Sequence, residues 1–285
     1  MKEIYFGLEK KVYFPENLQE CSSDEYIDIC RLIYLYHVKE IDWNQFLSLA
    51  VYSILKVKLT NKNKRTENED LEHWNNIAFL SQYIESFFIV DKETNSVQLI
   101  NHLSERKITH FNYWLKKYHA PSAGFLTNTY GQWEDAVEII LDHFKYPDED
   151  NIYKILSIFF LPKNEKYDKE KSLKRISKFK HLDLGIVYGF FLHITAFMNF
   201  LNSASVTIAG KEIDLSIIFD NDLNSYESPR PGIGIKATAY QMAESGVFGD
   251  YNNVRNSNLW EVLIRMYDIT KQAIDMQEQQ KQSSK

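Results

Sequence analysis

Hydrophobic residues recur three or four positions apart over most of the chain, which is the spacing of amphipathic α-helices. Two such stretches begin with a capping box, formed by Ser22 with Glu25 and by Asp42 with Gln45. Other stretches with helical spacing cover residues 71–86, 132–146, 152–161, 163–180, 182–202, 235–244 and 259–277. The pattern predicts a mainly α fold.

A different pattern occurs at a few places. Residues 87–90 and 97–100 are apolar and flank a turn sequence, which predicts a β-hairpin. Residues 206–219 fit a second small hairpin, and Tyr5 to Phe14 fits a short strand or extended lead-in. We therefore expect a single irregular multi-helix domain over residues 1–285 with one or two small β-hairpins. The polar stretch 60–70 is the place for a subdivision, and we expect the tail 278–285 to be flexible.

Residues 184–201 are almost free of charge and approach the length of a membrane span. His193 and Asn199 lie within the stretch, and the rest of the chain is soluble in character. A central helix that is buried on all sides has the same composition. We favour the core helix and expect no membrane partner, with membrane association as the alternative.

Composition narrows the class of protein. Hydrophobic residues make up 44% of the chain and the net charge is −6, so a packed globular protein is expected. The basic residues form no continuous patch, and we expect no nucleic acid partner. The two cysteines, Cys21 and Cys30, fit free buried thiols in a reducing compartment. The N-terminal segment lacks the features of a signal peptide, so a cytoplasmic location is expected.

Candidate chemistry is sparse. Glu134, Glu138 and Asp142 share one helical stripe that could supply part of a metal site, but a solvated acidic face explains the same residues and is favoured. Pro229 to Lys236 places two glycines before a helix, and a flexible connector is favoured over an anion site. We predict no catalytic residue, no metal and no cofactor.

The compositional oddity is the number of aromatic residues, 18 Tyr and 18 Phe. Most have helical spacing and belong to the core, but Tyr and Trp also suit partly wet interfaces. The region 111–118 and the final helix are the predicted contact surfaces with other proteins. The candidate protein-binding residues are Phe111, Tyr113, Trp114, Tyr118, Trp260 and Met266.

Several phrases along the chain resemble one group of proteins. They are Phe14-Pro15-Glu16-Asn17-Leu18 with Ser22 to Tyr26, Tyr130 to Ala136, Ile155 to Pro162, Tyr167-Asp168, Gly246 to Gly249, and Leu259 to Leu263. Their order is similar to that in uncharacterised tail-morphogenesis proteins of Bacteroidetes phages and prophages. Asn17-Leu18 stands where those proteins usually carry Trp.

The resemblance implies a non-enzymatic phage morphogenesis protein, plausible as a tail assembly chaperone. Its implied partners are a tape measure protein or tail subunits, in the cytoplasm of a bacterial host. A minor structural component of the virion is one alternative. An enzyme or a ligand-binding regulator, with a site that the sequence does not display, is the other. The sequence leaves the oligomeric state open.

Overall fold

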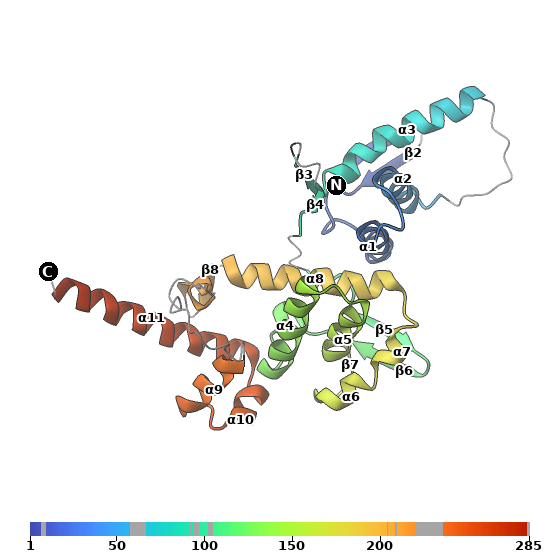
Figure 1. Ribbon diagram of the computed structural model, residues 1–285. Helices are drawn as coiled ribbons and strands as arrows, with labels where there is room; N and C mark the ends of the chain where they lie inside the picture. Colours follow the sequence, from blue (N-terminus) through green and yellow to red (C-terminus); the bar gives the residue numbers. More distant parts are fainter. Residues whose placement is uncertain are drawn as a thin grey trace. The chain divides into compact units, whose positions relative to one another are not determined.

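The protein is described by a computed structural model, shown in Figure 1. The structure describes residues 1–6, 10–57, 67–91, 93, 97–101, 105–203, 205–208, 210–219 and 236–283. Helices dominate these residues, and the strands form only small sheets of two or three strands. The predicted mainly α fold with small hairpins is therefore confirmed.

The chain forms two compact units, and each unit draws on two stretches of sequence. The first contains Met1–Ile108 and Leu182–His193, and the second contains Thr109–His181 and Ile194–Lys285. The chain thus passes between units at residues 108–109, 181–182 and 193–194. Helix α8 (Leu184–Ser203) contributes its first half to one unit and its second half to the other.

The described part of the first unit contains three whole helices, two hairpins and the first half of α8. Both capping boxes predicted from the sequence are present, at Ser22 for α1 and at Asp42 for α2. The predicted hairpin at 87–100 is β3 with β4, and the N-terminal segment forms a second hairpin, β1 with β2. The elements are β1 (Lys2–Phe6), β2 (Lys10–Phe14), α1 (Ser23–His37), α2 (Trp43–Ile54), α3 (Glu67–Glu85), β3 (Phe88–Val90) and β4 (Val97–Leu99).

The first half of α8 packs closely on α1. The Tyr26 hydroxyl donates a buried hydrogen bond of 2.7 Å to the carbonyl oxygen of Gly189. A Cβ at position 189 would lie only 2.8 Å from the Tyr26 ring, and one at Gly185 would overlap the carbonyl oxygen of Ile27. Glycine at both positions therefore permits the close approach of the two helices.

Among the described residues, α8 is the helix that is long and apolar enough to cross a membrane. However, 72% of its most apolar window is buried inside the protein. A helix whose most apolar window is mostly covered by its own chain leaves little apolar surface for lipid, and this supports the core-helix interpretation of residues 184–201.

The second unit contains α4, α5, the second half of α8, the long helix α11 and several short elements. Phe197 of α8 lies at its centre, with ring centroids 4.5 Å from Phe125 and 5.5 Å from Trp133. The elements are β5 (His110–Tyr113), β6 (Lys116–His119), η1 (Ala123–Phe125), α4 (Tyr130–Lys145), α5 (Glu149–Phe159), β7 (Leu161–Pro162), α6 (Lys169–Leu173), α7 (Ile176–Phe179), β8 (Ser205–Ile208), β9 (Lys211–Asp214), η2 (Leu215–Ile218), α9 (Lys236–Glu244), α10 (Tyr251–Asn256) and α11 (Leu259–Ser283).

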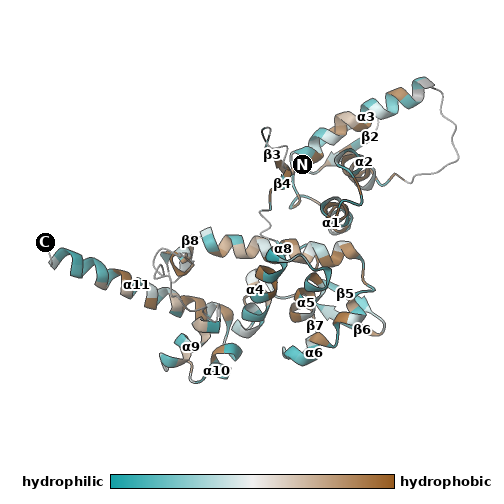
Figure 2. Cartoon of the chain, in the orientation of Figure 1, coloured by the Kyte–Doolittle hydropathy of each residue, from teal (hydrophilic) through white to brown (hydrophobic). Residues whose placement is uncertain are grey.

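Three parts of the second unit bear on the sequence predictions. The hairpin expected at 206–219 is present as β8 with β9, followed by η2. The single helix predicted at 163–180 is wrong, because α6 and α7 are short and separated around Lys174 and Arg175. Helix α11 continues to Ser283, and its last turns are exposed and hydrophilic (Figure 2).

The two cysteines are free and buried, as predicted. Burial raises the pKa of the Cys21 thiol to about 12, and it also raises the pKa of Cys30. Thiols of this kind behave as small hydrophobic side chains, because the reactive thiolate is disfavoured.

Gly185→Ala tests the packing of α8 on α1. Alanine favours a helix by about 1 kcal/mol over glycine, but the overlap with Ile27 reverses the sign. We expect the free energy of unfolding to fall by about 1–3 kcal/mol, measured by urea denaturation with circular dichroism. The control is Asn199→Ala at an exposed position of the same helix, where no loss is expected. A Gly185→Ala variant as stable as the wild type would contradict the close packing.

Candidate functional site

The start of α4 is held by hydrogen bonds from several directions. The side chain of Thr129 caps the helix, and Gln132 completes the capping box. The Gln132 amide also donates to the carbonyl oxygen of Ile158, 2.9 Å away. Backbone hydrogen bonds of 2.9 Å join Tyr130 to Ser257 and Leu259 to Asn128. The first turn of α4 is thereby fixed to α5 and to the segment between α10 and α11.

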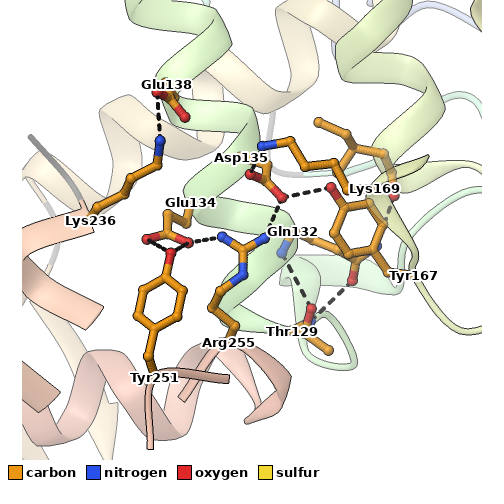
Figure 3. A network of polar contacts seen from close by, with 11 residues as sticks. Thr129, Gln132, Glu134, Asp135, Glu138, Tyr167, Lys169, Lys236, Tyr251 and Arg255 are labelled. Carbon is orange, nitrogen blue, oxygen red and sulfur yellow. Dashed lines mark hydrogen bonds and ion pairs between the residues drawn. The ribbon is translucent and has the colours of Figure 1, made fainter. Parts of the chain in front are cut away.

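Next to these bonds lies a buried network of charged side chains, shown in Figure 3. The guanidinium of Arg255 donates to the carboxylates of Glu134 and Asp135, which are adjacent on α4. Asp135 also accepts hydrogen bonds from the Tyr167 hydroxyl at 2.8 Å and from Lys169 at 2.6 Å. The two carboxylates are thus matched by two cations.

Gly131 makes this geometry possible. A Cβ at position 131 would lie 2.9 Å from the carbonyl oxygen of Arg255. The absence of a side chain lets α10 approach α4 closely enough for the Arg255 side chain to reach both carboxylates. Tyr251 stacks on Tyr240 with ring centroids 4.5 Å apart, which connects α9 to the same group of helices.

The two carboxylates differ in electrostatics. Burial raises the pKa of Glu134 and outweighs the opposing effect of Arg255. Burial also acts to raise the pKa of Asp135, but hydrogen bonds from Lys169, Arg255 and Tyr167 outweigh it and hold this pKa below its usual value. Asp135 is therefore the more firmly ionised partner of the pair.

The predicted solvated acidic face is wrong for one of its members. Glu138 and Asp142 are exposed, and Glu138 pairs with Lys236 at 3.0 Å. The side chain of Glu134 is fully buried. Helical periodicity placed Glu134 with its two neighbours, but it could not show that α10 covers the first turn of that stripe. The glycine-containing loop before Lys236 lies outside the described residues.

The network has the properties of a structural tie. Its carboxylates have 0% and 1% of their side-chain surface exposed and are already paired, so a substrate has no access to them. A buried pair of this kind orients the groups around it, since an unpaired charge there would be very costly. Among the described residues, no group of three or more His, Cys, Asp or Glu side chains is placed to hold a metal ion.

An open cleft of about 850 Å³ lies beside the network in the same unit. Tyr167, Thr129 and Gln132 belong both to the hydrogen-bonded framework and to the lining of the cleft. Asn128 is also part of the lining, and its buried Oδ1 atom accepts no hydrogen bond among the described residues. A buried acceptor without a donor costs about 1–3 kcal/mol, so its presence in a cleft wall is informative.

The third feature is the hairpin of β5 and β6. Phe111 and Tyr118 are paired across the strands and stack with centroids 5.4 Å apart. The Phe111 ring centroid also lies 5.0 Å from that of Phe160. Phe179 packs edge-on against the rings of Phe111 and Tyr118. Strand β7 pairs with β6 and closes the sheet. The base of the hairpin is therefore rigidly held by the core.

The tip of this hairpin has the opposite character. Trp114 and Leu115 form the loop between the paired residues Tyr113 and Lys116. Their exposed fractions are 88% and 102%, so the fold covers almost none of either side chain. Trp114 also has a φ of 54°, in the left-handed region that suits glycine or asparagine in tight hairpin loops.

The structure places the six predicted contact residues in two groups. Phe111, Tyr113, Trp114 and Tyr118 all lie on the β5–β6 hairpin. Phe111 and Tyr118 are buried in its base, so the surface that this region offers is the tip. Trp260 and Met266 lie on α11 and are half-buried. The indole of Trp260 donates to the carbonyl oxygen of Gly124 at 2.8 Å, so its polar group is used within the protein.

Sequence reasoning missed Leu115 and Arg255. Leu115 sits between residues that were selected, and the charged segment Lys116-Lys117 after it was the available signal for a surface turn. No local pattern identifies Arg255, because its partners are more than 100 residues away in sequence.

In comparisons with known proteins, no family model, no curated protein and no solved structure matches this chain significantly.

Arg255→Ala tests the structural tie. The substitution leaves two fully covered carboxylates without their main cation, and we expect the free energy of unfolding to fall by about 3–5 kcal/mol. Lys271→Ala is the control, because Lys271 lies at an exposed position of α11 and its pair with Asp275 contributes about 0–1 kcal/mol. Equal losses in the two variants, measured by urea denaturation, would argue against the tie.

The pKa shifts predict opposite pH profiles for Asp135→Asn and Glu134→Gln. The lowered pKa of Asp135 gives stability that is present above its ordinary value of 3.8 and is lost as the pH falls through the folded pKa. The difference in the free energy of unfolding between the wild type and Asp135→Asn should therefore shrink as the pH falls below 3.8. The raised pKa of Glu134 has the other sign, so the wild type should gain relative to Glu134→Gln as the pH falls towards 4.5. Denaturation curves between about pH 3 and pH 7 compare the variants, and parallel profiles would contradict this assignment.

Proposed function

We propose that this chain is a non-enzymatic protein-binding factor of phage tail morphogenesis that acts as a tail assembly chaperone and docks on its partner through the β5–β6 hairpin tip. The observation that carries the binding part is the exposure of Trp114 and Leu115 at the end of a rigidly held hairpin. The phage part rests on the resemblance of the sequence phrases described above.

The fold itself gives no reason for a tryptophan at this position. A non-glycine residue in the left-handed region costs about 1–2 kcal/mol, and asparagine or glycine would relieve that cost. Exposing a large ring to water adds no stability either. A side chain that is unfavourable for the loop and uncovered by the protein is best explained by burial in a partner.

The chemistry of the tip defines the partner surface. Trp is among the residues that most often dominate binding energy, when it fills a pocket near the centre of an interface. Lys116 and Lys117 follow the tip, are exposed, and form no ion pair among the described residues. The matching surface is an apolar pocket bordered by acidic residues on another protein. The rigid base limits the entropy that the hairpin loses on binding.

The resemblance supplies the identity of that partner, a tape measure protein or a tail subunit in the cytoplasm of the bacterial host. A protein that stays in the finished particle would use the same tip, so a minor virion component is the alternative within this proposal. The cleft beside the buried network favours a second candidate function, a ligand-binding regulator.

Replacing Trp114 by Gly together with Leu115 by Ser separates binding from folding. Because glycine suits a positive φ, the variant should keep its stability or gain up to about 1 kcal/mol. Binding should weaken by about 2 kcal/mol or more, which is about thirtyfold, since both anchoring side chains are lost. Tagged variant and wild type are purified from phage-infected or prophage-induced cells, and the viral proteins retained are quantified by mass spectrometry. Mature particles are analysed in parallel.

The matched control is Leu71→Ala with Trp74→Ala, which removes an exposed Leu and Trp from α3. Retention of a tape measure or tail subunit by the wild type and by this control, but not by the tip variant, supports the proposal. Absence of the chain from particles indicates a chaperone, and its presence indicates a structural component. Equal retention by the tip variant, a tip-dependent self-association, or binding to anionic vesicles in place of any viral protein would each overturn it.

A further inference from the structure

The cleft beside the ion-pair network has two walls that are held in place before any ligand arrives. One wall is the turn Pro162 to Glu165, closed by a backbone hydrogen bond of 3.1 Å and carrying Asn164 at a φ of 64°, which asparagine tolerates. Glu165 is anchored by an ion pair with the nearly buried Arg175. The backbone hydrogen bond thus closes the turn, and the ion pair of Glu165 holds its last residue in place.

The other wall is the segment from Ser122 to Thr129. The hydroxyl of Ser122 accepts hydrogen bonds from the backbone N–H of Thr127 at 2.9 Å and from its hydroxyl at 3.0 Å. At its end, Thr129 caps α4. Two preformed walls lower the entropic cost of binding a small molecule between them.

The charge on the cleft lining is positive. Lys163 and Lys166 both line the cleft, are exposed, and form no ion pair within the described part of the chain. The acidic residue between them, Glu165, is neutralised by Arg175. Two unpaired ammonium groups beside a cleft attract an anion, and lysine is a common phosphate ligand.

The buried Oδ1 atom of Asn128, which accepts no hydrogen bond among the described residues, bears on which ligand would fit the cleft. Asn128 is 5% exposed, and its Nδ2 donates to Gln132, whose own amide donates to the carbonyl oxygen of Ile158. This chain of bonds fixes which way the Asn128 amide faces, so Oδ1 is the atom left without a donor. This atom has under 1 Å² of exposed surface, so a ligand hydroxyl or amine in the cleft can supply the missing hydrogen bond only where the side chains around Asn128 shift to uncover it.

The size of the cleft is consistent with a small molecule. Its volume of about 850 Å³ falls within the range of about 300–1,000 Å³ found for small-molecule sites. From the preformed walls, the two lysines and the buried Oδ1 atom of Asn128 together, we propose that this cleft binds a small phosphate ester whose organic part carries hydroxyl or amine donors. Lys163 and Lys166 hold the phosphate, and Asn128 with its neighbours contacts the organic part.

The proposal is tested on the full chain by isothermal titration calorimetry and by backbone amide shifts in NMR spectra. The probes are glucose 6-phosphate and adenosine monophosphate, with inorganic phosphate, glucose and adenosine as comparisons. We expect at least one ester to bind with a Kd of about 1 mM or tighter. Its amide shifts should be concentrated in residues 119–129 and 163–167, which border the cleft.

Charge reversal at Lys163→Glu and Lys166→Glu should weaken that binding by about tenfold or more. The control reverses Lys174 and Lys178, which are also exposed but lie outside the cleft, and should leave the Kd within about twofold. Asn128→Ala, checked for folding by circular dichroism, should weaken the ester and not inorganic phosphate. The exposed lysine pair keeps the test decisive if this variant does not fold.

Absence of heat and of amide shifts with both esters would overturn the proposal. So would equal affinity for inorganic phosphate, because the cleft would then recognise no organic part, or equal affinity for glucose or adenosine, because the phosphate would then play no role. None of these outcomes affects the hairpin tip, whose binding is measured with protein partners.

Discussion

The contact of Arg255 with Glu134 and Asp135 is the constraint on which the second unit depends. It brings α10 against the first turn of α4, where Gly131 leaves room for the backbone of Arg255. The same approach brings the segment after α10 into hydrogen-bond contact with the residues before α4. Both carboxylates are covered, so the network organises its surroundings and takes no direct part in chemistry with a substrate.

The features that can meet other molecules lie around this fixed centre. Tyr167 and Gln132 belong to the hydrogen-bonded framework and also line the cleft. The β5–β6–β7 sheet places the cleft and the hairpin tip at different ends of β6, since His119 lines the cleft and Lys116 adjoins the tip. One sheet thus carries part of the cleft at one end of β6 and the apolar tip at the other.

Local chemistry made much of the fold predictable. The capping boxes at Ser22 and Asp42 satisfy helix N–H groups within a few residues of sequence, so they can be recognised without tertiary information. The hairpins at 87–100 and 206–219 follow from short apolar runs around turn residues. The hairpin at 110–119 carries Trp-Leu in its loop in place of the usual turn residues, and for that reason its sequence gave no hairpin signal.

The sequence by itself determined the mainly α fold, most of its helices, the buried free thiols and the region in which exposed aromatic residues occur. It could not determine which residues of that region are covered. Phe111 and Tyr118 are buried because Phe160 and Phe179 come from distant positions to pack on them, and Trp114 is exposed because no described residue packs on the tip in this way. In the same way, Glu134 differs from Glu138 only because Arg255 lies over one turn of α4 and not over the next. Helical and strand periodicities are local properties, whereas burial and charge pairing depend on residues brought together by the tertiary structure.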